Sequence, residues 1–184
     1  NRERQRFGEN ANKAHAQRDV LSEIFPDLAI EAKPYFVDRN NVLVLIREGD
    51  VVFSCVDNHA TRKLLSDHIG TLRDGLLISG GNELYDGNVQ IYERRDGKNI
   101  TPPLTYLHPE IAQPKDKNPA DAHCDRLSRE GEPQLFVVNL TIATLMLNAY
   151  MLFLLDRAFP YTESFFSLFK GEARPVRRVV IDNE

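Results

Sequence analysis

The sequence feature that most restricts the fold is the abrupt change of pattern within residues 51–62, VVFSCVDNHATR. Residues 51–55 form an apolar block of the kind found in strands buried on both faces of a parallel sheet. Residues 58–70 then place apolar side chains at helical spacing, directly after Asp57 and Asn58. A strand that runs straight into a helix predicts an α/β fold, in which polar groups at the carboxyl ends of strands are candidates for ligand binding. Asp57 is therefore the first candidate site residue.

The other patterns along the chain extend the α/β prediction. Alternating apolar residues predict strands, apolar residues at helical spacing predict helices, and Asp86-Gly87 is typical of a turn between strands. At that turn we expect the sheet to change from parallel to antiparallel. The predicted elements, in chain order, are a helix over 11–25, a strand over 28–37, a short helix or turn over 40–47, a buried strand over 75–81, a half-exposed strand over 89–92, a helix over 135–155 and a final strand over 176–181.

A polar stretch rich in Pro, Lys and Asp covers residues 94–133. A connection of this length within a compact domain is either functional or disordered. The apolar stretch that follows, 135–155, is long enough to cross a membrane, but polar residues such as Asn139 and Asn148 interrupt it. We therefore interpret it as a buried or interface helix.

Composition and charge argue against several classes of function. The chain carries 23 basic and 27 acidic side chains, so its net charge of -4 gives no general attraction to nucleic acid or to an anionic membrane. Two cysteines, Cys55 and Cys124, are too few for a disulfide framework, and no signal peptide opens the sequence. These features favour a reducing, cytoplasmic location. Cys55 lies in the apolar block, so we expect it to be buried and structural.

Four short motifs occur in a fixed order along the chain. They are Asn1-Arg2-Glu3-Arg4-Gln5, Lys13-Ala14, Cys55-Val56-Asp57-Asn58 with Arg62, and the segment 78–89 with its glycine turn and Asp86-Gly87-Asn88-Val89. Together they resemble the ThiF/MoeB/E1 superfamily, whose members adenylate the C-terminal glycine of ubiquitin-like and sulfur-carrier proteins. The resemblance implies an α/β fold with a Rossmann-like, mostly parallel sheet and an antiparallel extension.

The resemblance also assigns roles to residues. It implies ATP and Mg²⁺ as cofactors, with Arg4 and Lys13 on the phosphates, Asn1 and Gln5 in the same polar cradle, and Asp57 on the magnesium ion. These residue types suit the chemistry, because activating a carboxylate with ATP needs cations against the polyphosphate and a carboxylate for the metal. Asn58 would brace the turn or touch the nucleotide.

Each of these residues also has a simpler interpretation. An Asp-Asn pair before a helix is often an N-cap, and charged side chains such as Arg4 and Lys13 are mostly solvated at the surface. Arg62 follows Asn58 by one helical turn and fixes the turn more readily than it touches a substrate.

Cys124 has two interpretations. It lies in the polar stretch between His123 and Arg126, where it either receives the activated carrier as a thioester or persulfide, or is an idle loop cysteine.

Two departures from the superfamily affect these expectations. The chain has no Cys-x-x-Cys pair, so the zinc site of some members is not expected. It also has no GxGxxG motif, and the N-terminal βαβ portion that would bind the nucleotide is expected upstream of Asn1 or on another chain. We therefore divide the chain into the C-terminal portion of an adenylation domain (1–158), which includes a crossover loop (94–133), and an aromatic extension (159–184).

Three functional hypotheses follow. The first is an E1-like adenylyltransferase that activates a small β-grasp ubiquitin-like or sulfur-carrier protein, acts as a homodimer or with an E1-like subunit, and binds neither nucleic acid nor membrane. The second is a catalytically inactive E1-like scaffold or partner subunit. The third, a nicotinamide-binding domain, requires the same glycine motif and gives no role to Asp57 and Asn58.

Overall fold

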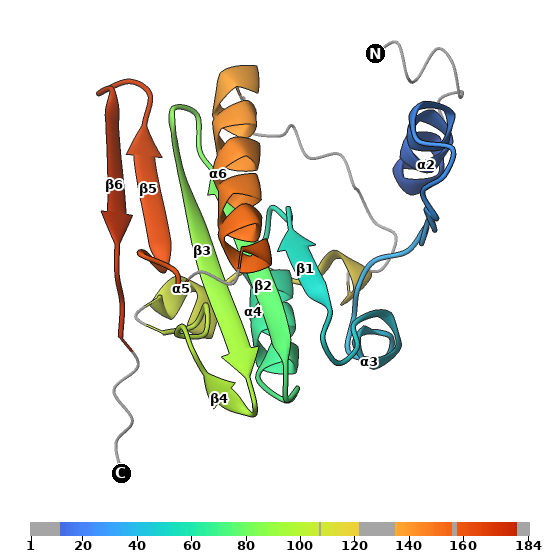
Figure 1. The fold of residues 1–184 in the computed structure, drawn as a ribbon, viewed down its shortest axis with the longest axis horizontal. Coiled ribbons are helices and arrows are strands. Elements are labelled where there is room, and N and C mark those ends of the chain that lie inside the picture. The colour runs from blue at the N-terminus through green and yellow to red at the C-terminus, as the bar shows by residue number, and fades with distance from the viewer. Residues whose placement is uncertain (1–11, 107, 122–134, 156–157, 180–184) are drawn as a thin grey trace. The chain divides into compact units, whose positions relative to one another are not determined.

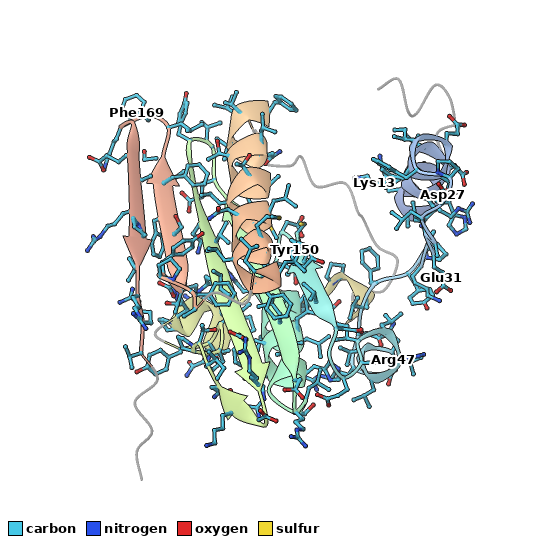
Figure 2. The ribbon with its side chains drawn as sticks, in the orientation of Figure 1. Lys13, Asp27, Glu31, Arg47, Tyr150 and Phe169 are labelled. Carbon is cyan, nitrogen blue, oxygen red and sulfur yellow. The ribbon has the colours of Figure 1, made fainter. Side chains whose placement is uncertain are left out.

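The computed structural model describes residues 12–106, 108–121, 135–155 and 158–179, and the chain divides into two compact units, Asn1–Phe36 and Val37–Glu184. The first unit contains helix α2 (Lys13–Ile24), as predicted. Asn12 caps this helix, because its Oδ1 accepts a hydrogen bond from the backbone N–H of Ala14 at 2.9 Å. Lys13 is the first residue of the helix (Figure 2).

The strand predicted over 28–37 is wrong. These residues form no strand, and the side chains of Leu28, Tyr35 and Phe36 are exposed. Alternation of apolar residues predicts a strand only where a neighbouring strand is available to pair with it, and no described strand pairs with this segment.

The second unit is built on a sheet with the strand order β1-β2-β3-β5-β6, and β4 pairs with β3 (Figure 1). β1 and β2 are parallel, whereas β3 pairs with β2, β4 and β5 in antiparallel fashion, as does β5 with β6. The α/β class and the change from parallel to antiparallel pairing are thus confirmed, with one parallel pair among the described strands. The turn predicted at Asp86-Gly87 is wrong in position, because these residues begin β3 and residues 83–85 connect it to β2. The strands are β1 (Val51–Ser54), β2 (Gly75–Asn82), β3 (Asp86–Arg95), β4 (Lys98–Asn99), β5 (Glu163–Ser167) and β6 (Glu172–Val176).

Helices cover both faces of this sheet (Figure 1). Helix α6 (Phe136–Leu154) packs on one face against Leu76 and Ile78 of β2. On the other face, Leu77 of β2 packs in a cluster with residues of α3, α4 and α5. Successive residues of β2 therefore serve opposite cores, which is why its sequence is continuously apolar rather than alternating. The bounds are α3 (Val42–Leu45), α4 (His59–Ile69) and α5 (Pro109–Ala112), and η1 (Pro119–Asp121) follows α5.

Helix α6 is the one helix among the described residues that is long and apolar enough to cross a membrane. One of its stripes, formed by Val138, Ile142, Met146 and Ala149, is buried against the sheet. Tyr150 also contacts the ring of Phe53 in β1 edge to face, with ring centroids 5.5 Å apart (Figure 2). The helix thus belongs to the protein core on one side, while its opposite side is exposed.

The C-terminal region contributes two strands to the same sheet. The strand predicted over 176–181 is misplaced: β6 ends at Val176, residues 177–179 form no strand, and residues 180 and 181 lie outside the described residues. β5 lies earlier, where Phe165 and Phe166 pair with Asn88 and Gly87 of β3. Phe159 and Phe166 are buried in the core beneath α6, whereas Phe169 at the tip of the β5–β6 hairpin is 79% exposed (Figure 2). β3 is also more buried than predicted, because strands flank it on both sides.

The close packing of α6 on β2 yields a prediction about Gly80. A Cβ atom at this position would lie 2.5 Å from Cγ2 of Ile142 and 2.6 Å from the sulfur of Met146, so Gly80→Ala overpacks the core. We expect it to lower the free energy of unfolding by about 1–3 kcal/mol in urea denaturation. Gly75→Ala in the same strand is the control, because the nearest atom to its Cβ would be Cδ1 of Ile69 at 3.4 Å, an ordinary contact distance. Equal stability of the two variants would contradict this packing.

Candidate active site

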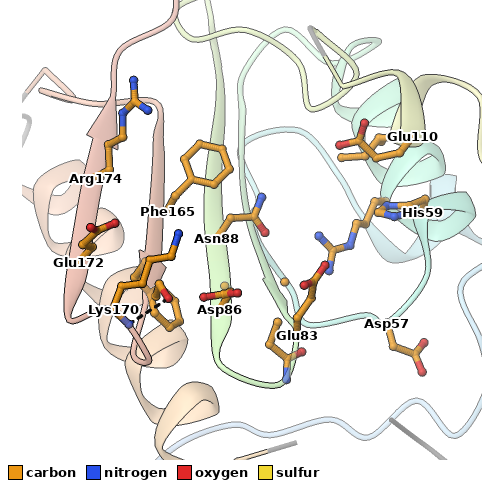
Figure 3. A pocket seen from close by; sticks show the side chains of 17 residues that line it. Asp57, His59, Glu83, Asp86, Asn88, Glu110, Phe165, Lys170, Glu172 and Arg174 are labelled. Carbon is orange, nitrogen blue, oxygen red and sulfur yellow. Dashed lines mark hydrogen bonds between the residues drawn. The ribbon is translucent and has the colours of Figure 1, made fainter. Parts of the chain in front are cut away.

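A cavity of about 900 Å³ opens on the face of the sheet that carries α4 and α5 (Figure 3). Asp57 and His59 line it at the beginning of α4, and Glu110 lines it from α5. Lys170, Glu172 and Arg174 of the β5–β6 hairpin, with Phe165, lie on the opposite side of the cavity in Figure 3. The cavity therefore extends from the predicted metal ligand Asp57 to the C-terminal hairpin. Its other lining residues are Arg62, Gly81, Asn82, Glu83, Asp86, Gly87, Asn88, Ile111, Phe166 and Ser167.

The sheet forms the floor of the cavity. Strand pairing places Gly81 opposite Asn88, Asn88 opposite Phe165, and Phe165 opposite Arg174. Because directly paired residues present their side chains on the same face of a sheet, these four positions form a row across β2, β3, β5 and β6. An extended peptide that follows this row would cross the strands toward Asp57.

In the turn before α4, Asn58 caps the helix and the adjacent Asp57 faces the cavity. Asn58 is 3% exposed, and its Oδ1 accepts a hydrogen bond from the backbone N–H of Thr61 at 2.8 Å, so Asn58 is the N-cap. Asp57 is exposed and lines the cavity, and the amide of Asn58 donates to its Oδ1 at 3.4 Å. The cap leaves the carboxylate of Asp57 at the cavity surface, while contact of Asn58 with a nucleotide stays a prediction.

Arg62 ties the ends of two strands together. Its side chain is 7% exposed, and Nη2 donates to the carbonyl oxygens of Val56 and Gly80, each at 3.0 Å. Burial lowers the pKa of Arg62, and the negative charges of Asp116 and Asp57 oppose that effect. Arginine nevertheless stays protonated in proteins, so a permanent cation lies beneath the turn that carries Asp57.

Gly81 provides the space for this arginine. A Cβ atom at position 81 would lie 2.6 Å from Nη1 of Arg62 and 2.8 Å from Oδ1 of Asn88. The second glycine of the predicted glycine turn is therefore required because a guanidinium group lies directly on the strand.

Asp116 is a site residue that the sequence did not reveal. Its two carboxylate oxygens accept hydrogen bonds from the backbone N–H groups of His59 at 2.7 Å and Ala60 at 2.9 Å. This pairing satisfies the first turn of α4 and suits the positive end of the helix dipole. It also fixes part of the polar stretch 94–133 beside Asp57, which composition alone could not indicate.

Cys55 differs from its prediction. It is exposed rather than buried, because it follows the last residue of β1 that pairs with β2, and β1 is the last strand in the described order. Partial burial of the thiol raises the pKa of Cys55, and the charge of Arg62 opposes the rise. A thiol with a raised pKa is mostly protonated at neutral pH and is a weak nucleophile.

The remaining predicted site residues are not brought together by the described part of the chain. Asn1, Arg4, Gln5 and Cys124 lie outside the described residues. Lys13 belongs to the first unit, and its contact with phosphate stays a prediction.

The side chains around Asp57 fit a magnesium ion held jointly with phosphate groups. Within the described residues, no group of three or more His, Cys, Asp or Glu is placed to enclose a metal ion. Mg²⁺ needs less from a protein, since it is commonly held by one or two carboxylates together with substrate phosphates and water. Asp57 supplies such a carboxylate. Nε of Arg62 and Nδ1 of His59 are buried without a hydrogen-bond partner among the described residues, and both side chains line the cavity.

The geometry around Arg62 yields a second prediction. Arg62→Lys should lower the free energy of unfolding by about 1–3 kcal/mol. The lysine side chain is shorter than that of arginine, so its ammonium group cannot take the position of Nη2, which donates to both carbonyl oxygens. Chemical denaturation measures the change. Lys63→Met on the same helix is the control, since its ion pair with Asp67 is largely exposed and contributes little. A loss for Arg62→Lys no greater than that of the control would rule out this role.

Comparison with known proteins gives both a family and distant relatives. A match to the ThiF family covers residues 3–181. The "Adenylyltransferase and sulfurtransferase MOCS3" of Drosophila virilis is 35% identical over 81 residues, which cover 44% of this chain and 18% of that protein. The protein of the same name from Drosophila yakuba is 37% identical over 86 residues, 47% of this chain and 19% of that protein. The chain thus aligns with less than a fifth of these relatives, but because the family match covers nearly all of it, the chain belongs to the ThiF family.

Proposed function

We propose that this protein is an E1-like adenylyltransferase that uses ATP and Mg²⁺ to adenylate the C-terminal glycine of a small ubiquitin-like or sulfur-carrier protein. Membership of the ThiF family and the likeness to proteins named adenylyltransferases support this class of reaction. The observation that carries the proposal is the cavity, which joins the carboxylate of Asp57 to an open row of positions across the sheet.

The shape of the cavity suits the end of a peptide chain. Its volume of about 900 Å³ is within the range of small-ligand sites, and its floor crosses several strands rather than ending in a deep pocket. A C-terminal glycine has no Cβ, so its carboxylate can approach a phosphate closely. The carrier's tail would lie along the row that ends at Gly81, with its carboxylate near Asp57.

The reaction needs positioning more than covalent help from the protein. A carboxylate oxygen of the carrier attacks the α-phosphorus of ATP, the new C–O–P linkage forms, and pyrophosphate leaves with the bonding electrons. Bound Mg²⁺ would neutralise negative charge on the phosphates. Asp57 would hold that ion, and Asn58 and Arg62 fix the turn that carries Asp57. Arg4, Lys13, Asn1 and Gln5 are the residues that the family resemblance assigns to the phosphates.

Cys124 would act after adenylation. Its thiolate would attack the activated carbonyl carbon, form a thioester with the carrier and release AMP. This step belongs to the proposal alone, because Cys124 lies outside the described residues.

The exposed side of α6 supports a proposal about assembly. Phe136, Leu140, Leu147 and Leu154 are exposed and recur at helical spacing, so they form an apolar stripe opposite the buried one. We propose that this stripe pairs with a second copy in a cytoplasmic homodimer. Leu147→Glu should then shift the protein from dimer to monomer in sedimentation velocity, whereas Lys98→Glu on β4 should not. A wild-type monomer at micromolar concentration would contradict the proposal.

ATP–pyrophosphate exchange tests the reaction directly. In the full-length protein with a glycine-tailed carrier, Asp57→Asn should reduce exchange by about 100-fold or more, because the metal loses its carboxylate. Asp67→Asn is the matched control, since Asp67 lies on the exposed side of the same helix. Circular dichroism should show that both variants are folded. Exchange retained by Asp57→Asn would refute the role given to Asp57. Exchange absent from the wild type with every carrier tried would support the inactive scaffold instead.

A further inference from the structure

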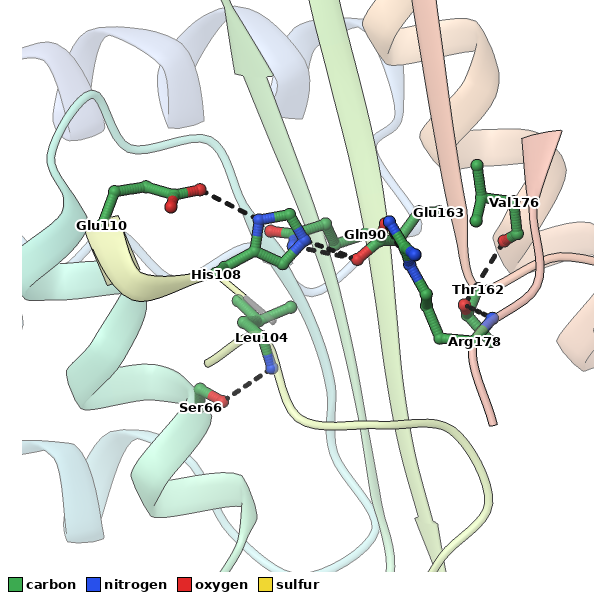
Figure 4. Close-up of polar contacts among 9 residues, drawn as sticks. All are labelled: Ser66, Gln90, Leu104, His108, Glu110, Thr162, Glu163, Val176 and Arg178. Atoms are coloured by element: carbon green, nitrogen blue, oxygen red, sulfur yellow. Dashed lines mark hydrogen bonds and ion pairs between the residues drawn. The ribbon is translucent and has the colours of Figure 1, made fainter. Parts of the chain in front are cut away.

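A cluster of charged side chains joins α5 to the sheet next to the cavity (Figure 4). Its centre is His108, which immediately precedes α5. Nε2 of His108 lies 2.6 Å from Oε1 of Glu163 on β5, and Nδ1 lies 2.9 Å from Oε1 of Glu110 on α5. Both nitrogens of one imidazole ring are therefore directed at carboxylate oxygens.

This geometry requires the charged form of the ring. A neutral imidazole carries one N–H group, so it can donate to one of the two carboxylates, whereas the imidazolium ion donates to both. The hydrogen bond with Glu163 raises the pKa of His108 above its ordinary value of 6.5, burial opposes the rise, and the bond with Glu110 adds to it.

Glu163 is the buried side of the pair. It is 4% exposed, its Oε2 accepts from Nε of Arg178 at 3.2 Å, and the neutral amide of Gln90 on β3 is 3.5 Å from its Oε1. Burial raises the pKa of Glu163, but the bonds and charges of His108 and Arg178 together bring it below its ordinary value. Arg178 continues to neutralise Glu163 when His108 loses its proton, so opening the pair does not leave a buried charge alone.

Glu110 is the exposed side. Burial raises its pKa, and its backbone hydrogen bond and its interactions with His108 and with His59 of α4 bring it below its ordinary value. Glu110, its neighbour Ile111 and His59 line the cavity. The ring of His108 thus links the strand that forms the floor of the cavity to the helix that forms one of its walls.

The chain before His108 is anchored differently. The backbone N–H of Leu104 donates to Oγ of Ser66 on α4 at 3.0 Å, a bond between groups that do not titrate near neutral pH. Leu104 and Ile111 are both buried in the core beneath α4. The titratable bond from His108 to Glu163 is therefore a direct tie between this segment and β5.

We propose that His108 is a pH-sensitive latch on the carrier-binding cavity. As an imidazolium ion it ties α5 to β5 and holds the wall formed by Glu110 and Ile111 over the floor. When it loses its proton, one ring nitrogen turns a lone pair toward a carboxylate, so the tie weakens and the cavity opens more readily. That the widened cavity admits a carrier's tail rests on the proposed function, but the latch itself does not.

The direction of the pH dependence follows from the two kinds of group. The pKa of His108 is raised on folding, so both bonds are present at pH values below 6.5 and one of them is lost as pH rises through the raised pKa. The pKa values of Glu163 and Glu110 are lowered, so the tie is also lost as pH falls through values below 4.5. The latch is closed between these limits.

Hydrogen exchange of the full chain, followed by NMR without ATP or carrier, tests the latch. The reporters are the amides of Ile111, Ala112 and Gln113, which donate to the carbonyl oxygens of His108 and Pro109. At pH 6, His108→Gln should lower their protection factors about ten-fold or more, because one amide cannot replace two charge-assisted bonds. Protection in α4 should not change. His15→Gln on α2 is the matched control and should leave α5 unchanged.

The wild-type protein provides an independent measurement if His108→Gln fails to fold. Titration of the imidazole nitrogens by NMR should give His108 a pKa above 6.5, and α5 protection should fall through the same pH range. A pKa at or below 6.5, or α5 protection that is unchanged across the titration, would overturn the latch. These measurements do not depend on ATP–pyrophosphate exchange. If adenylation is absent but His108 titrates as expected and α5 protection falls with it, the proposed function is rejected and the latch is retained.

Discussion

The bond between Arg62 and the carbonyl oxygens of Val56 and Gly80 is the interaction on which the candidate site depends. It connects α4 to the ends of two parallel strands and pairs a buried charge with two backbone acceptors. Asn58 can cap the helix and Asp57 can face the cavity only while this geometry holds. A long-range polar contact, more than apolar packing, therefore determines where the carboxylate lies.

Features set by neighbouring residues could be predicted from the sequence. Helix α4 and strand β2 appear at their predicted positions, because apolar spacing and the cap Asn58 are local signals. The predictions of a strand over 28–37 and of a buried Cys55 were wrong for the opposite reason. The burial of these residues depends on whether another strand lies beside them. The position of the last strands also depended on pairing with β3, which is distant in sequence.

The same division applies to the site. Asp57 could be predicted, since the end of an apolar strand and the start of a helix mark the place where α/β proteins bind ligands. Asp116 and His108 could not, because each lies in an unpatterned polar stretch and meets its partner only in the folded chain. Lys170 and Arg174 were assigned to an extension, although strand pairing makes them part of the cavity. Local periodicity contains no information about such encounters.

The position of β3 between β2 and β5 has a consequence for how the family can vary. Both ends of the long connection that contains α5 and α6 are fixed on adjacent strands, since Gln90 pairs with Glu163. The entropy of closing such a connection grows only with the logarithm of its length, so doubling it costs about 0.6 kcal/mol. The connection between β3 and β5 can therefore change in length with little effect on the stability of the sheet, so the cavity floor and its covering helices can vary independently of each other.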